Sequence, residues 1–103
     1  MIACIIEFGI KEGKADAVSK LLDVLMDEVG TIDGYISKES FESRDTAGKL
    51  ISLSYWRDET ALEDWNKNRA HVVAMFKGKR ELFDYYKIEI STLERVREWQ
   101  STD

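Results

Sequence analysis

Two tryptophans and the only histidine lie within one short stretch of this sequence. Tyr55-Trp56-Arg57 closes a predicted strand, Trp65 follows on a predicted helix, and His71 comes soon after. Histidine is the side chain whose unperturbed pKa allows proton exchange near neutral pH, and large aromatic rings provide flat apolar walls. The stretch therefore predicts a small hydrophobic site that transfers a proton, although an ordinary core with one surface histidine has the same residues.

Each of these aromatic residues has a structural alternative. His71 is predicted as a general base, or else as a histidine at a helix start that bonds a carbonyl group or solvent. Trp56 and Trp65 are predicted to line a pocket for a planar aromatic substrate. Both tryptophans could instead fill the core, and the three-residue spacing between Leu62 and Trp65 favours that alternative for Trp65.

Two polar residues complete the predicted site. Arg57 is expected to bind a substrate anion by hydrogen bonds, or else to form an ion pair with Asp58 or Glu59, which is the simpler interpretation. Tyr85, in the last predicted strand, is expected to offer its hydroxyl group to the substrate, although tyrosines are common in sheets.

The composition limits the class of protein. The chain has 103 residues, which suits one domain over residues 1–97 and a polar tail over 98–103. A net charge of −5 argues against nucleic acid and anionic membranes as partners, and no apolar run approaches the roughly 20 residues of a membrane span. The single cysteine, Cys4, excludes an intramolecular disulfide and suggests a reducing cytoplasm. No metal-ligand cluster and no nucleotide-binding loop is recognisable, so no tightly bound cofactor is expected.

The hydrophobic periodicity predicts an order of β-α-β-β-α-β. The expected strands are 1–10, 35–44, 49–57 and 84–96, and the expected helical segments are 14–29, 58–68 and 70–83, the last interrupted near Gly78. This order is typical of an α+β, ferredoxin-like fold, with a four-stranded antiparallel sheet and its helices on one face. The strands are apolar on both faces, so we expect two copies to bury their open sheet faces in a symmetric homodimer.

Several short motifs together resemble a known family. Gly34-Tyr35 opens a strand, Glu39-Ser40 lies within it, Leu53 to Arg57 ends the next strand, and Trp65, His71 and Tyr85-Tyr86 follow. In this order they resemble the antibiotic biosynthesis monooxygenase (ABM) domain, over about residues 1–97. The resemblance matches Trp65 to the helix tryptophan of the signature and His71 to the histidine that follows it.

The resemblance implies a dimeric α/β barrel with a pocket between sheet and helices in each subunit. It implies a monooxygenase that oxidises a small aromatic, phenolic or quinone-like substrate with O2 and needs no cofactor. Haem-degrading proteins resemble the same fold, and haem binding is one alternative. These proteins use an asparagine on the first strand, where this chain has Ile6 or Glu7. A non-catalytic dimer that binds small ligands is the other alternative.

Overall fold

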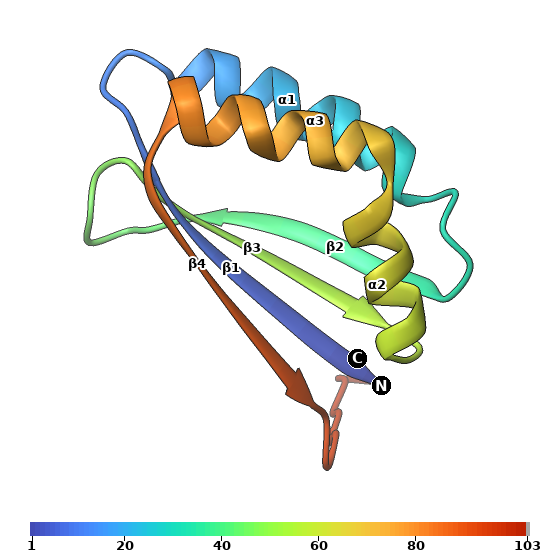
Figure 1. The fold of residues 1–103 in the computed structure, drawn as a ribbon. Helices are drawn as coiled ribbons and strands as arrows, with labels where there is room; N and C mark the ends of the chain where they lie inside the picture. The colour runs from blue at the N-terminus through green and yellow to red at the C-terminus, as the bar shows by residue number, and fades with distance from the viewer. Residues whose placement is uncertain (103) are drawn as a thin grey trace.

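The computed structural model describes residues 1–102, so residue 103, the end of the predicted tail, lies outside the described residues. Figure 1 shows one four-stranded sheet with its helices gathered on one side. The elements are, in chain order, β1 (Ile2–Ile10), α1 (Ala15–Val29), β2 (Tyr35–Glu42), β3 (Lys49–Trp56), α2 (Glu59–Lys67), α3 (Arg69–Lys77), the π-helical turn η1 (Gly78–Leu82) and β4 (Phe83–Thr92).

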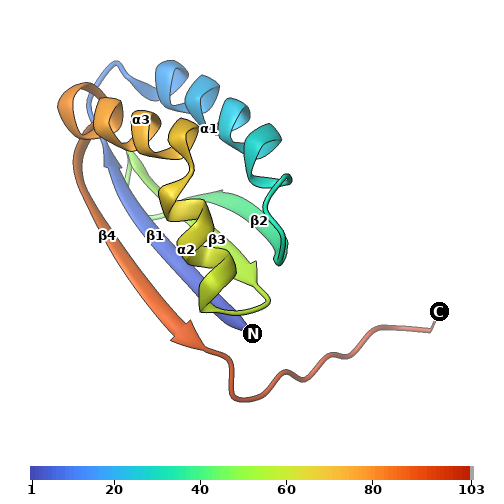
Figure 2. The same ribbon diagram turned by 45° about the vertical axis from the view of Figure 1, so that its right-hand side comes forward.

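The strands are arranged in the order β2-β3-β1-β4, and all neighbours are antiparallel. Both views show α1 and α3 side by side over one face of the sheet, with α2 turning down toward the end of β3 (Figures 1 and 2). The prediction of an α+β, ferredoxin-like fold is confirmed. The structure ends β2 two residues and β4 four residues before the predicted ends.

The alternation of buried side chains along β1 shows which face of the sheet the helices cover. Ile2, Cys4 and Phe8 are buried on the helix side. From α1, Val18, Leu25 and Val29 supply the opposite wall of the core. Side chains of a strand alternate between faces while those of a helix recur every three to four residues, so the two patterns meet along one apolar layer.

Two side-chain caps fix the bend between α2 and α3. Asp58 accepts a hydrogen bond from the Ala61 amide at 3.0 Å, and Asn68 accepts one from the His71 amide at 3.1 Å. Asn68 also donates to Glu28 of α1 at 3.1 Å, which ties the junction to the neighbouring helix. Such caps satisfy amides that have no partner inside the helix, so the start of α3 is held in place.

Two apolar clusters stand at opposite ends of the layer between sheet and helices. One, around Trp56, Trp65 and Leu62, lies under α2, and the other is built around Phe8 and Phe83. Between them the helix-facing surface of the sheet carries small side chains, namely Cys4, Ser52 and Ser54. Small residues at these places leave space that larger apolar side chains would otherwise fill.

The chain beyond β4 is extended. Residues 93–102 contain no helix or strand, and Figure 2 shows them leading away from the sheet. Trp99 is 88% exposed there. Within residues 1–102, no helix combines the length and apolar character that crossing a bilayer requires.

Candidate functional site

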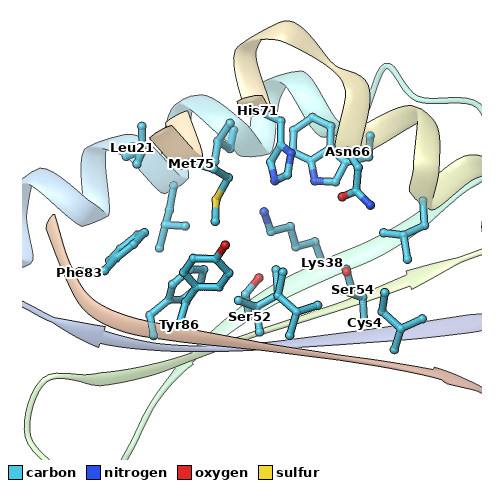
Figure 3. Close-up of a pocket in the computed structure, with 18 of the residues that line it drawn as sticks. Cys4, Leu21, Lys38, Ser52, Ser54, Asn66, His71, Met75, Phe83 and Tyr86 are labelled. Atoms are coloured by element: carbon cyan, nitrogen blue, oxygen red, sulfur yellow. The ribbon is translucent and has the colours of Figure 1, made fainter. Parts of the chain in front are cut away.

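A pocket of about 240 Å³ occupies the space between the two apolar clusters. Its floor is the small-residue patch of Cys4, Ser52 and Ser54, and Figure 3 shows it below the helices, with Met75 and His71 descending from α3. Leucines of α1 and aromatic residues at its two ends make most of the wall apolar. A concave apolar site with a few converging polar groups is typical of small-molecule binding.

His71 lines this pocket from the first turn of α3. Its ring centroid lies 4.5 Å from that of Trp65, at an interplanar angle of 33°. The Nδ1 atom is buried and has no hydrogen-bond partner among the described residues. A buried polar atom without a partner is unfavourable in a folded protein, so this atom marks a place where a ligand would be stabilised.

The pKa of His71 is lowered from 6.5 to about 4, mainly because burial disfavours the charged imidazolium and secondarily because the Lys38 ammonium is nearby. The imidazole is therefore neutral at pH 7. A neutral imidazole accepts a proton, which is the state that a general base requires.

Lys38 of β2 faces the same pocket, although it is not among the predicted site residues. Figure 3 shows its amine and the His71 ring pointing toward one another from opposite sides. The Lys38 Nζ atom lies 5.6 Å from the centroid of the Trp65 ring. Burial lowers the pKa of Lys38, and no carboxylate of residues 1–102 forms an ion pair with it.

A β-bulge explains why sequence reasoning missed Lys38. Tyr35 pairs with Trp56, but Ser37 then pairs with Tyr55 and Lys38 with Ser54, so one extra residue is inserted between Tyr35 and Ser37. Regular alternation from Tyr35 would direct residue 38 to the open face of the sheet. The bulge reverses that phase and brings Lys38 to the helix-facing side.

Of the predicted site residues, the structure brings His71 and Trp65 together in the pocket. Trp65 also belongs to the core cluster under α2, as its structural alternative predicts, and its contact with a substrate stays a prediction. Trp56 is fully buried in that cluster, where its Nε1 donates to the Ser54 hydroxyl at 2.9 Å, and it does not line the pocket.

Arg57 and Tyr85 lie away from the pocket. Arg57 pairs with Asp58 at 3.0 Å and with Asp33 at 3.4 Å, so the simpler interpretation, an ion pair with Asp58, is confirmed. Tyr85 lies on the open face of the sheet and donates its hydroxyl to Glu7 at 2.8 Å. The next residue, Tyr86, lines the pocket instead.

Other polar groups at the pocket are neutral or basic. Asn66 of α2 and Lys79 of η1 lie along its edge, and burial raises the pKa of the Cys4 thiol, which keeps it protonated. Among the described residues, no group of three or more His, Cys, Asp or Glu side chains is arranged to hold a metal ion. The chemistry available here is proton transfer and binding of a partly apolar molecule.

Comparison with known proteins identifies the family. The sequence model of the antibiotic biosynthesis monooxygenase family matches residues 1–82. The chain belongs to the ABM family. A jasmonate monooxygenase ABM from Pyricularia oryzae is 30% identical over 90 residues, which cover 87% of this chain but 42% of that protein. This ABM chain thus spans less than half the length of that relative.

Solved structures share the ABM fold closely. A putative antibiotic biosynthesis monooxygenase from Deinococcus radiodurans matches with a TM-score of 0.88 at 14% identity, covering 98% of this chain and 100% of the other. SnoaB, a cofactor-independent oxygenase from Streptomyces nogalater, matches with a TM-score of 0.80 at 12% identity, covering 92% and 94%. At these identities the likeness establishes the fold.

Proposed function

We propose that this protein is a cofactor-independent monooxygenase that adds one oxygen atom from O2 to a small aromatic, phenolic or quinone-like substrate. The observation that carries the proposal is the buried, unpartnered Nδ1 atom of His71 in a largely apolar pocket. Membership of the ABM family and the relative named as a jasmonate monooxygenase support an oxygenase. SnoaB supports chemistry without a cofactor on this fold.

In the proposed first step, His71 takes the proton of a substrate hydroxyl. The imidazole is neutral at pH 7 because its pKa in the empty pocket is about 4. Once the substrate oxyanion forms beside it, the opposite charges stabilise each other and the pKa of His71 rises again. This attraction is strong where water is excluded, so the pocket favours the ion pair.

The electron-rich anion then passes one electron to O2, giving a substrate radical and superoxide. These recombine through a new C–O bond to give a peroxide, which takes up the proton held by His71. The O–O bond then breaks, and the oxygen bound to carbon becomes a carbonyl group. The other oxygen leaves as water, which carries the former hydroxyl proton of the substrate and the hydrogen of the ring carbon that was attacked. Trp65 supplies a flat wall for the ring, and the apolar enclosure protects the peroxide from premature hydrolysis.

The size of the pocket limits the substrate. An apolar cavity of about 150 Å³ holds benzene. The 240 Å³ here therefore suits one or two fused rings better than three or four. Among phenols we accordingly propose a monocyclic or bicyclic substrate.

Oxygen uptake by the purified protein tests the proposal. With a dihydroxynaphthalene, we expect the wild-type protein to consume oxygen and to incorporate one ¹⁸O atom from ¹⁸O2 into the product. His71→Ala should lose nearly all of the oxygen uptake and of the ¹⁸O incorporation. Arg57→Gln is the control, because its ion pairs lie outside the pocket. Uptake that is unchanged in His71→Ala would overturn the assignment of the base. A protein that binds such compounds without consuming oxygen would be a ligand-binding dimer instead.

Haem binding is tested in the same preparation. Adding hemin is expected to produce no Soret band that depends on His71. A band that disappears in His71→Ala would replace the cofactor-independent mechanism by haem chemistry. The comparison is direct, because His71 is the only histidine in the sequence.

We further propose a cytoplasmic homodimer that buries the open face of the sheet. Apolar side chains remain on that face, including Phe41 at 45% exposure and the partly exposed Leu53 and Tyr55. Paired sheets would remove this surface from water. Analytical ultracentrifugation at micromolar concentration should report a dimer, and a stable monomer would contradict this proposal.

A further inference from the structure

The pocket has an unbalanced positive charge. Lys38 extends into it from β2, and Lys79 lies at its edge on η1. The residues that line the pocket include no Asp or Glu, although the whole chain has a net charge of −5. The local charge is therefore opposite to that of the protein as a whole, which makes it a property of the pocket.

The neutral polar groups around Lys38 do not replace a counter-ion. On the floor, the Ser54 hydroxyl already accepts a hydrogen bond from Trp56, and Ser52 is a neutral group. Across the pocket, His71 is neutral and supplies no negative charge, while Trp65 offers only the face of its ring at 5.6 Å. A buried ammonium without a carboxylate is unfavourable, and an anionic ligand would relieve this penalty.

We propose that the ligand of this pocket is a small organic oxyanion. Its carboxylate or phenolate oxygen pairs with the Lys38 amine, and its apolar body of one or two rings lies against Trp65 and the leucines of α1. This inference rests on the proposed function in one respect, namely that the pocket is the substrate site. It adds the charge of the substrate and a residue that recognises it.

The two possible sources of the oxyanion have different consequences. If the oxygen is a permanent carboxylate, Lys38 orients the substrate and His71 acts on another part of the molecule. If it is the hydroxyl that His71 deprotonates, Lys38 stabilises the anion as it forms. In both cases a charge-assisted pair forms at a half-buried amine that has no carboxylate partner among residues 1–102, and such pairs are stronger than neutral hydrogen bonds.

Calorimetric binding of matched ligands tests the inference without requiring turnover. The ligands are 2-naphthoate and 2-naphthamide, which have nearly the same shape and differ in charge. The wild-type protein is expected to bind the carboxylate about tenfold or more tightly than the amide. Lys38→Met, which keeps the length of the side chain and removes its charge, should abolish this preference, whereas Lys38→Arg should keep it.

The control is Lys20→Met on the exposed side of α1, which changes the net charge equally but lies outside the pocket. It should retain the full preference for the carboxylate. Equal affinity of the wild type for both ligands, a preference that survives Lys38→Met, or no binding of the carboxylate at about 1 mM would each overturn the inference. Thermal unfolding and circular dichroism establish that Lys38→Met is folded.

A third ligand, 2-naphthol, distinguishes the sources of the charge. A naphtholate absorption band in the complex that weakens in Lys38→Met would identify the phenolate. Binding of the carboxylate alone would identify the permanent acid. If oxyanions bind through Lys38 but no phenol consumes oxygen, the oxyanion site stands and the monooxygenase proposal fails. If oxygen is consumed but the charge of the ligand has no effect on binding, the monooxygenase proposal stands and the oxyanion site fails.

Discussion

The two faces of the sheet carry two polar clusters that differ in how their groups are satisfied. On the open face, Glu7 accepts a hydrogen bond from Tyr85 at 2.8 Å and lies 3.5 Å from the Lys49 amine. We call these three residues the open-face cluster. On the helix-covered face, the pocket pair of Lys38 and His71 has no carboxylate partner within residues 1–102.

The pKa shifts of the two clusters express this difference. The pKa of Glu7 is lowered chiefly by the hydrogen bond from Tyr85, so its charged form is stabilised. The pKa values of His71 and Lys38 are lowered chiefly by burial, so their charged forms are destabilised. The open-face cluster stabilises the folded state without a ligand. The pocket pair of Lys38 and His71 would be stabilised by a bound ligand, which is the pattern expected of a functional site.

The largest expected difference between the clusters is in activity. His71→Ala should lower the rate of oxygen uptake by about 10² to 10⁴, which is the usual contribution of a general base. Tyr85→Phe removes a hydroxyl on the other face and should change the rate by less than about threefold, because it touches no pocket group. Initial rates from an oxygen electrode measure both. A larger loss of rate in Tyr85→Phe than in His71→Ala would mean that the open face, and not the pocket, carries the activity.

The second expected difference is in stability. Lys38→Met should raise the free energy of unfolding by about 1 kcal/mol, because it removes a half-buried charge that has no carboxylate partner among residues 1–102. Thermal unfolding in the absence of ligand should show this as a midpoint higher by about 4 °C or more. Lys20→Met on the exposed side of α1 serves as the control and should change the midpoint little. A destabilised Lys38→Met protein would mean that the amine has a structural role.

A third difference concerns pH. The unfolded chain protonates His71 near pH 6.5, whereas the folded state resists protonation until about pH 4. The unfolded state therefore binds more protons in this window, and stability falls as the pH decreases through it. After allowance for solvent screening of the partly exposed ring, the loss is about 1–2 kcal/mol. Urea unfolding of wild type and His71→Gln at pH 7 and pH 5 measures it, and parallel losses in both proteins would exclude His71 as the cause.

The smallest expected effect comes from the open-face cluster. Glu7→Gln removes the charge that pairs with Lys49 but keeps an acceptor for the Tyr85 hydroxyl. We expect a slight decrease of the urea midpoint at pH 7 and no change in ligand affinity. Because the pKa of Glu7 is lowered in the folded state, the decrease should shrink as the pH falls below the usual carboxyl range and the wild-type carboxylate takes up a proton. An effect on ligand binding would show that the two faces are coupled.

The sequence predicted the fold well because the fold depends on periodicity. Alternating apolar residues in β1 and helical spacing in α1 are local signals, and each defines a buried face without knowledge of its partner. The closeness of Trp65 and His71 was also predictable, because both belong to the bend between α2 and α3 that Asn68 caps.

The remaining site residues depend on strand phase, which the sequence does not specify. Lys38 reaches the pocket only because of the bulge between Tyr35 and Ser37. Tyr85 and Tyr86 are adjacent aromatic residues of one strand, and the register opposite Gly9 and Phe8 decides which one faces the helices. A shift of one residue would exchange their roles, and composition and spacing are the same in both cases.

The protonation state of His71 tests the central claim most directly, and the single histidine makes its assignment unambiguous. Nitrogen NMR of the ¹⁵N-labelled imidazole, recorded against pH, should give a pKa near 4 in the free protein. Adding a phenolic ligand at pH 7 should convert the ring to imidazolium as the ligand loses its proton. A pKa near 6.5 that does not respond to any phenol would contradict the account, because His71 would then be an ordinary solvent-exposed side chain.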